Sequence, residues 1–248
     1  MRSMRALLSI YGWFWLTFVL VLTFFVVAVV GIFTIPFDPG RYIVGRSARM
    51  TGALASRGTP FWRFSWGGKR PENPRKPYVV VVNHESNFDP FLLSHLPFEM
   101  KYLSKKSLFR IPFFGWAMRI VGDIAIDRGD KDSRGRSLDA CKVVLAKKVS
   151  VLIFPEGTRS RTDEMLPFKP GAFRLAIETG LEILPLGLTG TRDALPKGTW
   201  LFTPAKARVL VGEPIPTAGL TVDDVPALAE RVRGVVAALR DQARAELG

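Results

Sequence analysis

An uncharged stretch near the start of the chain limits how this protein can fold and where it can reside. No charged residue occurs over residues 6–37, and Arg2 and Arg5 stand just before the stretch. As one helix it would be about 48 Å long, more than the roughly 30 Å hydrocarbon thickness of a bilayer. A secretory signal peptide has an apolar region of about 7–15 residues before a small-residue cleavage site, and this stretch fits neither feature. The sequence therefore predicts a membrane anchor.

A second helix is expected directly after the anchor, over residues 41–56. Ile43, Met50 and Leu54 would share one face of it, and Arg49 would point away from that face. Arginines beside an apolar stripe can reach lipid phosphates, so a helical hairpin sunk into one leaflet is one interpretation. One transmembrane helix followed by a linker is the other, because a run this long also permits spanning.

The composition narrows what the rest of the chain can do. Lys and Arg number 35 against 22 Asp and Glu, a formal net charge of +13. This balance indicates an anionic partner: a phospholipid surface, a nucleic acid or a phosphorylated metabolite. One cysteine excludes an internal disulfide, and with only two histidines no metal site is expected. We divide the chain into an anchoring helical segment, residues 1–57, and an α/β domain, residues 58–248.

Short apolar runs alternate with helical patterns through the α/β domain. Strands are expected over residues 78–82, 122–126, 151–154, 183–188 and 207–211. Helices are expected over residues 91–96, 111–121, 137–148 and 172–180, and a last helix begins after a capping box, Thr221 with Asp224. This alternation predicts an α/β fold with a mainly parallel, partly mixed central sheet flanked by helices.

Polar loops follow three of the predicted strands. Ligands in such sheets collect beyond the carboxyl ends of the strands. The loops read Asn83-His84-Glu85-Ser86-Asn87-Phe88-Asp89-Pro90, Asp127-Arg128 and Pro155-Glu156-Gly157-Thr158-Arg159-Ser160. We therefore expect a site at this edge of the sheet.

His84 is a candidate general base. A neutral imidazole can take the proton of an alcohol near neutral pH, and a carboxylate on its other ring nitrogen fixes the tautomer. Asp89 can supply that carboxylate only if the chain bends, because residues five apart lie about 140° apart around a helix. The alternative is that Asp89, followed by Pro90, simply caps a helix.

The loop after residues 151–154 suits an anion. Gly157 lets the backbone approach a ligand, Thr158 offers a hydroxyl and Arg159 can bind a phosphate with two nitrogens. An ordinary β-turn with a solvated arginine is the alternative. Further cations are expected in neighbouring loops: Lys101, Lys105, Lys106, Arg110 and Arg128. The aromatic runs over residues 61–66 and 109–116 can line an acyl channel, touch lipid or belong to the core.

The polar loops resemble sequence blocks of the glycerolipid acyltransferases. Asn83-His84 through Asp89 is similar to their His-x4-Asp block. Residues 122–128 resemble the second block, residues 154–160 the third, and residues 183–188 the fourth. The resemblance spans residues 78–211 in the family's order and is to the PlsC type, the bacterial 1-acyl-glycerol-3-phosphate acyltransferases.

The resemblance implies a reaction. His84, oriented by Asp89, would activate the sn-2 hydroxyl of lysophosphatidic acid, which would take the acyl group from acyl-CoA or acyl-carrier protein without an acyl-enzyme, forming phosphatidic acid. The acceptor site would comprise Glu156, Gly157, Thr158, Arg159, Lys105 and Arg128. The family implies no cofactor besides the acyl donor, which is a co-substrate. The expected partners are these substrates and the phospholipid bilayer, not nucleic acid. The expected location is the cell membrane, with the domain on the cytoplasmic side.

Two other functions are compatible with the sequence. One is the same chemistry on another lysolipid, such as a lyso-ornithine lipid. The other is a non-catalytic basic module that binds anionic lipid or nucleic acid. Such a module has no need for the pair of His84 and Asp89, and its binding would weaken steeply with salt.

Overall fold

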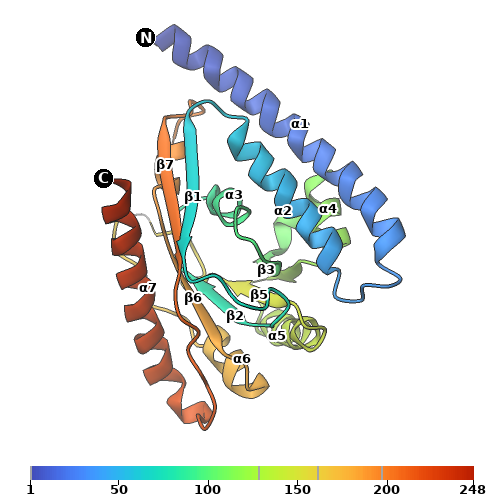
Figure 1. Ribbon diagram of the computed structural model, residues 1–248, viewed down its shortest axis with the longest axis vertical. Helices are drawn as coiled ribbons and strands as arrows, with labels where there is room; N and C mark the ends of the chain where they lie inside the picture. The colour runs from blue at the N-terminus through green and yellow to red at the C-terminus, as the bar shows by residue number, and fades with distance from the viewer. Residues whose placement is uncertain (1, 128, 161, 197) are drawn as a thin grey trace.

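A seven-stranded sheet forms the centre of the molecule in this computed structural model, which describes residues 2–127, 129–160, 162–196 and 198–248. The strand order is β1-β7-β6-β2-β5-β3-β4 (Figure 1). The strands are β1 (Trp62–Gly68), β2 (Val79–Val82), β3 (Met100–Lys105), β4 (Ile124–Ile126), β5 (Ser150–Ile153), β6 (Ile183–Thr189) and β7 (Ala205–Val211). β6 and β7 pair antiparallel and the other neighbours pair parallel. The predicted mainly parallel, partly mixed sheet is confirmed.

Helices cover both faces of the sheet (Figure 1). One face carries α5 (Lys131–Ala146), α6 (Gly171–Thr179) and α7 (Val225–Leu247). The other face carries α3 (Asp89–Leu93), and beyond it lie α1 (Arg2–Thr34), α2 (Tyr42–Arg57) and α4 (Phe114–Val121). The described part of the chain also contains three short 3-10 helices: η1 (Lys106–Arg110), η2 (Thr191–Ala194) and η3 (Val222–Asp224). The capping box of Thr221 and Asp224 forms as predicted.

The sequence of β2 explains why the site is anchored at its end. All four of its valines are fully buried. Val79 and Val81 pack with the helices α5, α6 and α7, whereas Val80 and Val82 pack toward α3. Alternate residues of a strand point to opposite faces, so an unbroken apolar run fits a strand covered on both sides. Burial of β2 on both faces therefore holds the backbone in place where the polar loop after Val82 begins.

Two strands were not predicted, β1 and β3. β1 overlaps the aromatic run over residues 61–66 that was expected to line a channel, touch lipid or belong to the core. Trp62 and Phe64 stack there in parallel planes, and Trp62 packs edge-on against Phe88. β3 contains Lys101, which was expected in a loop; that expectation is wrong. The Lys101 ammonium is buried, pairs with Glu99 at 3.0 Å and donates to the Arg41 carbonyl at 2.8 Å, which satisfies a charge inside the sheet.

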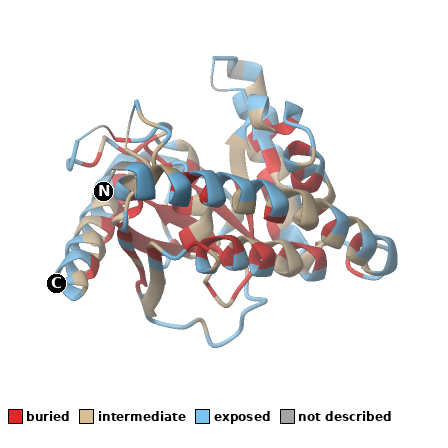
Figure 2. Ribbon diagram, turned by 90° about the horizontal axis from the view of Figure 1, so that it is seen from above, coloured by how far each residue is buried: buried red, intermediate tan, exposed pale blue. Residues whose placement is uncertain are grey.

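Helix α1 lies against the rest of the molecule along its length. Near its start Arg5 Nε donates to the Phe202 carbonyl at 2.9 Å, and further along Trp15 Nε1 donates to the Ala55 carbonyl at 3.0 Å. Toward its end the Phe24 ring meets Trp116 at 5.5 Å. Its outer face stays exposed (Figure 2). Between Ser3 and Thr34 this helix is long and apolar enough to cross a membrane.

Buried ion pairs hold α2 to the sheet. Arg49 points inward, away from the face that carries Ile43, as predicted. Its guanidinium lies 3.3 Å from Asp123 and 3.7 Å from Glu99, and it stacks over the Tyr102 ring. Removing one partner of a buried ion pair costs about 3–5 kcal/mol, so α2 is fixed to the domain rather than joined by a loose linker.

Candidate active site

His84 and Asp89 meet at the carboxyl end of β2. His84 Nδ1 lies 2.6 Å from Asp89 Oδ2. The Asp89 side chain is fully buried, whereas the His84 side chain keeps 15% of its surface exposed. A carboxylate on Nδ1 leaves the lone pair on Nε2, so the accessible ring nitrogen can accept a proton. The chain bends between the two residues, as the pairing requires.

Asp89 is not a helix cap. Its carboxylate accepts hydrogen bonds from the backbone N–H of Glu85 at 2.9 Å and of Ser86 at 3.1 Å, and from the Thr191 hydroxyl. Phe88, not Asp89, precedes the first turn of α3. A buried carboxylate needs such donors to remain charged. Thr191 was missed because it lies in η2, far along the chain.

Glu156 holds the His84 backbone in place. Its two carboxylate oxygens accept from the backbone N–H of His84 at 2.7 Å and of Leu166 at 2.9 Å. Burial raises the pKa of this carboxyl, while the two N–H donors lower it. Glu156 lies in the loop after β5 and accepts from the backbone of His84, in the loop after β2, so it links the two loops. Phe154 adds a stacked contact, with its ring 4.1 Å from the imidazole.

The turn after β5 presents its polar side chains to solvent. Gly157 has φ +70°, a backbone conformation that favours glycine. Thr158 and Arg159 are exposed. The next residue, Ser160, donates its backbone N–H to the His84 carbonyl at 2.9 Å. Arg159 therefore lies one residue from a direct contact with the His84 loop.

Of the other predicted cations, Lys105, Lys106 and Arg110 lie at the end of β3, further along the same edge. Lys105 ends β3 and is exposed, with β5 between β3 and β2. Arg128 lies outside the described residues. Lys169 was not among the predicted cations, and its ammonium lies next to Gly157. Cationic side chains on neighbouring loops can bind one phosphate together.

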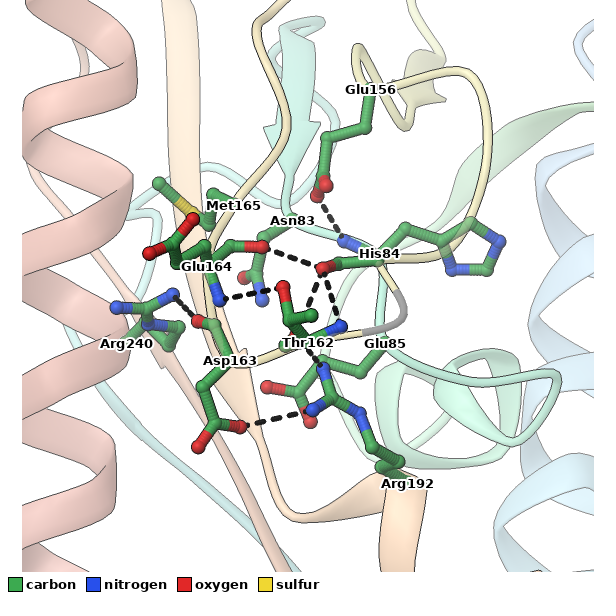
Figure 3. Close-up of a pocket in the computed structure, with 11 residues that line it drawn as sticks. Asn83, His84, Glu85, Glu156, Thr162, Asp163, Glu164, Met165, Arg192 and Arg240 are labelled. Carbon is green, nitrogen blue, oxygen red and sulfur yellow. Dashed lines mark hydrogen bonds and ion pairs between the residues drawn. The ribbon is translucent and has the colours of Figure 1, made fainter. Parts of the chain in front are cut away.

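Glu85 is a partly buried carboxylate behind the histidine. Its side chain accepts from the Gly190 backbone N–H at 3.1 Å. Burial, and then the nearby charge of Asp89, raise the pKa of Glu85 to about 7. Glu85, Asp163 and Arg192 surround a hollow of only about 10 Å³ behind the loop, room for one water at most. Figure 3 shows the imidazole directed away from this hollow, so substrates would approach from the opposite side.

Comparison with known proteins identifies the family. A family model described as acyltransferase matches residues 65–189, half of the chain. The chain belongs to the acyltransferase family. The matched region contains both polar loops described above, and with them the whole contact between His84 and Asp89.

Two relatives of this chain are named 1-acyl-sn-glycerol-3-phosphate acyltransferase. A 1-acyl-sn-glycerol-3-phosphate acyltransferase from Chlamydomonas reinhardtii is 38% identical over 184 residues, covering 73% of this chain and 54% of that protein. The human alpha enzyme of the same name is 40% identical over 162 residues, covering 64% of this chain and 57% of its own length. The chain thus spans about half the length of the curated relatives it matches.

A solved structure has the same fold. The crystal structure of the 1-acyl-sn-glycerophosphate acyltransferase PlsC from Thermotoga maritima superposes with a TM-score of 0.79 at 25% identity. The match covers 100% of this chain and 98% of the other. The likeness therefore includes the N-terminal helices as well as the sheet.

Proposed function

We propose that this acyltransferase moves an acyl group from acyl-CoA or acyl-carrier protein to the sn-2 hydroxyl of 1-acyl-glycerol-3-phosphate, forming phosphatidic acid. The observation that carries the proposal is the 2.6 Å contact between His84 Nδ1 and Asp89 Oδ2, on a chain whose relatives are named for this reaction. The site offers a base, and the exposed Arg159 beside it offers a phosphate ligand.

In the proposed reaction His84 Nε2 takes the proton of the sn-2 hydroxyl as that oxygen attacks the thioester carbonyl carbon. The carbon–oxygen bond forms, the carbon–sulfur bond breaks, and the imidazolium returns its proton to the leaving thiolate. Asp89 stabilises the imidazolium while it exists. The acyl group passes directly from sulfur to oxygen, and no acyl-enzyme forms.

Arg159 and Lys105 are proposed to hold the phosphate of the acceptor. Thr158, and Arg128 outside the described residues, are further candidates. Arg159 is exposed, and among the described residues no carboxylate lies within ion-pair distance of it. A free guanidinium next to the base can place the phosphate so that the neighbouring hydroxyl meets Nε2. Glu156 and Gly157 would shape this site through the loop rather than by touching the acceptor.

We propose that α1 and α2 lie in one leaflet of the cell membrane, with the sheet on the cytoplasmic side where acyl donors are found. The contacts of Arg5, Trp15 and Phe24 hold α1 flat against the domain from end to end. A spanning helix would have to break them. Large exposed apolar side chains cover the outer face of this helix pair: Leu7, Ile10, Phe14, Phe18, Phe25, Val29, Ile32 and Phe33 on α1, and Ile43, Met50 and Leu54 on α2. Such a face matches an interfacial helix.

The test is thiol release from acyl-CoA or acyl-carrier protein by the purified protein, with and without lysophosphatidic acid. We expect release that requires the acceptor, with phosphatidic acid as the lipid product. A panel of lysolipids, including lyso-ornithine lipid, tests the same chemistry on another acceptor. Salt-sensitive lipid binding with background thiol release on every acceptor would instead indicate a non-catalytic module.

A further inference from the structure

A second hollow lies along the outer edge of the sheet, beside β4. Its volume is about 830 Å³, within the range of small-molecule sites. Helix α5 forms one wall, and η1, α4 and the turn before α2 form the other. We call it the β4 groove and define it by its cations: Arg41, Lys106, Arg110, Arg119, Arg136 and Lys147.

The β4 groove has an excess of positive charge. Lys106, Arg110, Arg119 and Lys147 are exposed, and none of the ion pairs among the described residues involves them. Asp123, the carboxylate among the described residues of its wall, is already bound by Arg49. A concave surface of one sign concentrates ligands of the opposite charge. The groove therefore suits an anion with several charges.

The groove is closed to an added strand. The Ser137 hydroxyl donates to the Ala125 carbonyl at 2.9 Å, and the Ser133 hydroxyl accepts from the Asp127 backbone N–H at 3.0 Å. These serines of α5 occupy backbone groups of the edge strand that a peptide would need for β-sheet pairing. A small molecule fits this edge better than an extended chain.

The position of the groove indicates which substrate it serves. β4 is three strands from β2, about 14 Å at a spacing of about 4.8 Å per strand. The phosphate of a lysophosphatidic acid is only a few bonds from its sn-2 hydroxyl. While that hydroxyl contacts His84, the phosphate can reach no further along the edge than Lys105 at the end of β3, and not the far side of the groove beyond β4. A coenzyme A thioester has its phosphates on a nucleotide that a long pantetheine arm separates from the reacting carbonyl. Lys106 and Arg110 of the groove follow β3 at the same edge of the sheet as His84. The pantetheine arm can therefore run along this edge from the groove to His84.

We propose that the β4 groove binds the phosphorylated adenosine end of a coenzyme A thioester. The inference rests on the proposed function, because it takes acyl-CoA as the donor. The groove cations would bind the phosphates. An apolar strip of α5, formed by Ala140, Val143 and Val144, would pack on the adenine ring. Val143 is 55% exposed there with no other evident role.

Steady-state thiol release tests the proposal with the double variant Arg119→Gln/Lys147→Gln. Both side chains are exposed, so folding is not expected to suffer. We expect the KM for acyl-CoA to rise by about tenfold or more, because charge-assisted contacts are lost, with kcat and the KM for lysophosphatidic acid unchanged. The matched control, Lys206→Gln/Arg231→Gln, removes two exposed cations elsewhere and is expected to behave as wild type.

A truncated donor separates donor recognition from a general loss of activity. An S-acyl-N-acetylcysteamine has the thioester end of the pantetheine arm and no phosphate. Wild type and the groove variant are expected to use it equally well. An unchanged KM for acyl-CoA in the groove variant, or an equal loss with the truncated donor, would overturn the proposal.

Equilibrium binding separates this inference from the proposed function. If the protein released no thiol on any acceptor, the function would be wrong, and the affinity for free coenzyme A would still test the groove. Weaker coenzyme A binding by the groove variant than by the control supports the inference, and equal binding refutes it. Weaker binding of the groove variant to phosphatidylglycerol vesicles, with unchanged coenzyme A affinity, would assign the groove to lipid instead and also refutes it.

Discussion

The Thr191→Val substitution tests whether the carboxylate of Asp89 is held in place by its surroundings. Thr191 is fully buried and donates its hydroxyl to Asp89, which also accepts from His84 Nδ1 and from two backbone N–H groups. Valine keeps the volume and removes the donor. A hydrogen bond to a charged group contributes about 1.5–3 kcal/mol, so the unfolding equilibrium should shift by roughly 10- to 150-fold.

The same substitution should also affect catalysis. A carboxylate with one donor fewer positions the imidazole less well, and a displacement of about 1 Å can cost a factor of about 100. We expect kcat to fall by about tenfold while the KM of each substrate stays unchanged. Thr191→Ser keeps the hydroxyl and is expected to restore most of both losses.

Urea denaturation gives the free energy of unfolding, and thiol release from acyl-CoA gives kcat and KM. A Thr191→Val protein with wild-type unfolding energy and wild-type kcat would refute the reasoning that this hydroxyl supports Asp89.

Three further outcomes are expected. Glu156→Gln loses one of two charge-assisted backbone contacts, so it should lower the free energy of unfolding by about 1.5–3 kcal/mol and also lower kcat. The control Glu164→Gln, at an exposed position, should change neither quantity when urea denaturation and thiol release are measured. The pKa of Glu85 is raised to about 7, so the folded state binds this proton more tightly than the unfolded state. The free energy of unfolding of wild type should therefore fall by up to about 3 kcal/mol as pH rises from about 4.5 to 7. Glu85→Gln should lack that fall when urea denaturation is measured across the same pH range. Phe25→Ser/Ile32→Ser removes exposed apolar side chains of α1 and should weaken binding to phospholipid vesicles by at least about tenfold. Val222→Ser, which removes an exposed apolar side chain on the other side of the sheet, should not weaken it.

Local patterns predicted the central strands β2, β5 and β6 because these strands are almost wholly apolar. β2, β5 and β6 are buried along their whole length, and a run such as Val79–Val82 fits little else. β3 was missed because Lys101 and Glu99 neutralise each other inside the protein, which no local pattern reveals. β1 was missed because its aromatic residues pack against Phe88 and Phe202, from distant parts of the chain.

Some residues of the candidate site could be predicted from the sequence, and others are known only from contacts in the folded protein. His84, Asp89 and Arg159 could be proposed from the sequence because their side-chain chemistry and their place after strands are both visible in it. Thr191 and Glu156 support the loop after β2 from distant segments, so only the folded contacts reveal what they do. The β4 groove was anticipated only as scattered cations, because its shape depends on how α5, η1 and α4 meet at the sheet edge.

The central claim is that His84, oriented by Asp89, is the base of an acyl transfer. Its most direct test is the rate of thiol release from acyl-CoA in the presence of lysophosphatidic acid, measured for purified wild type and for His84→Ala. We expect kcat of the variant to fall by about 10²- to 10⁴-fold while circular dichroism shows it folded. Equal rates for the two proteins would contradict the claim.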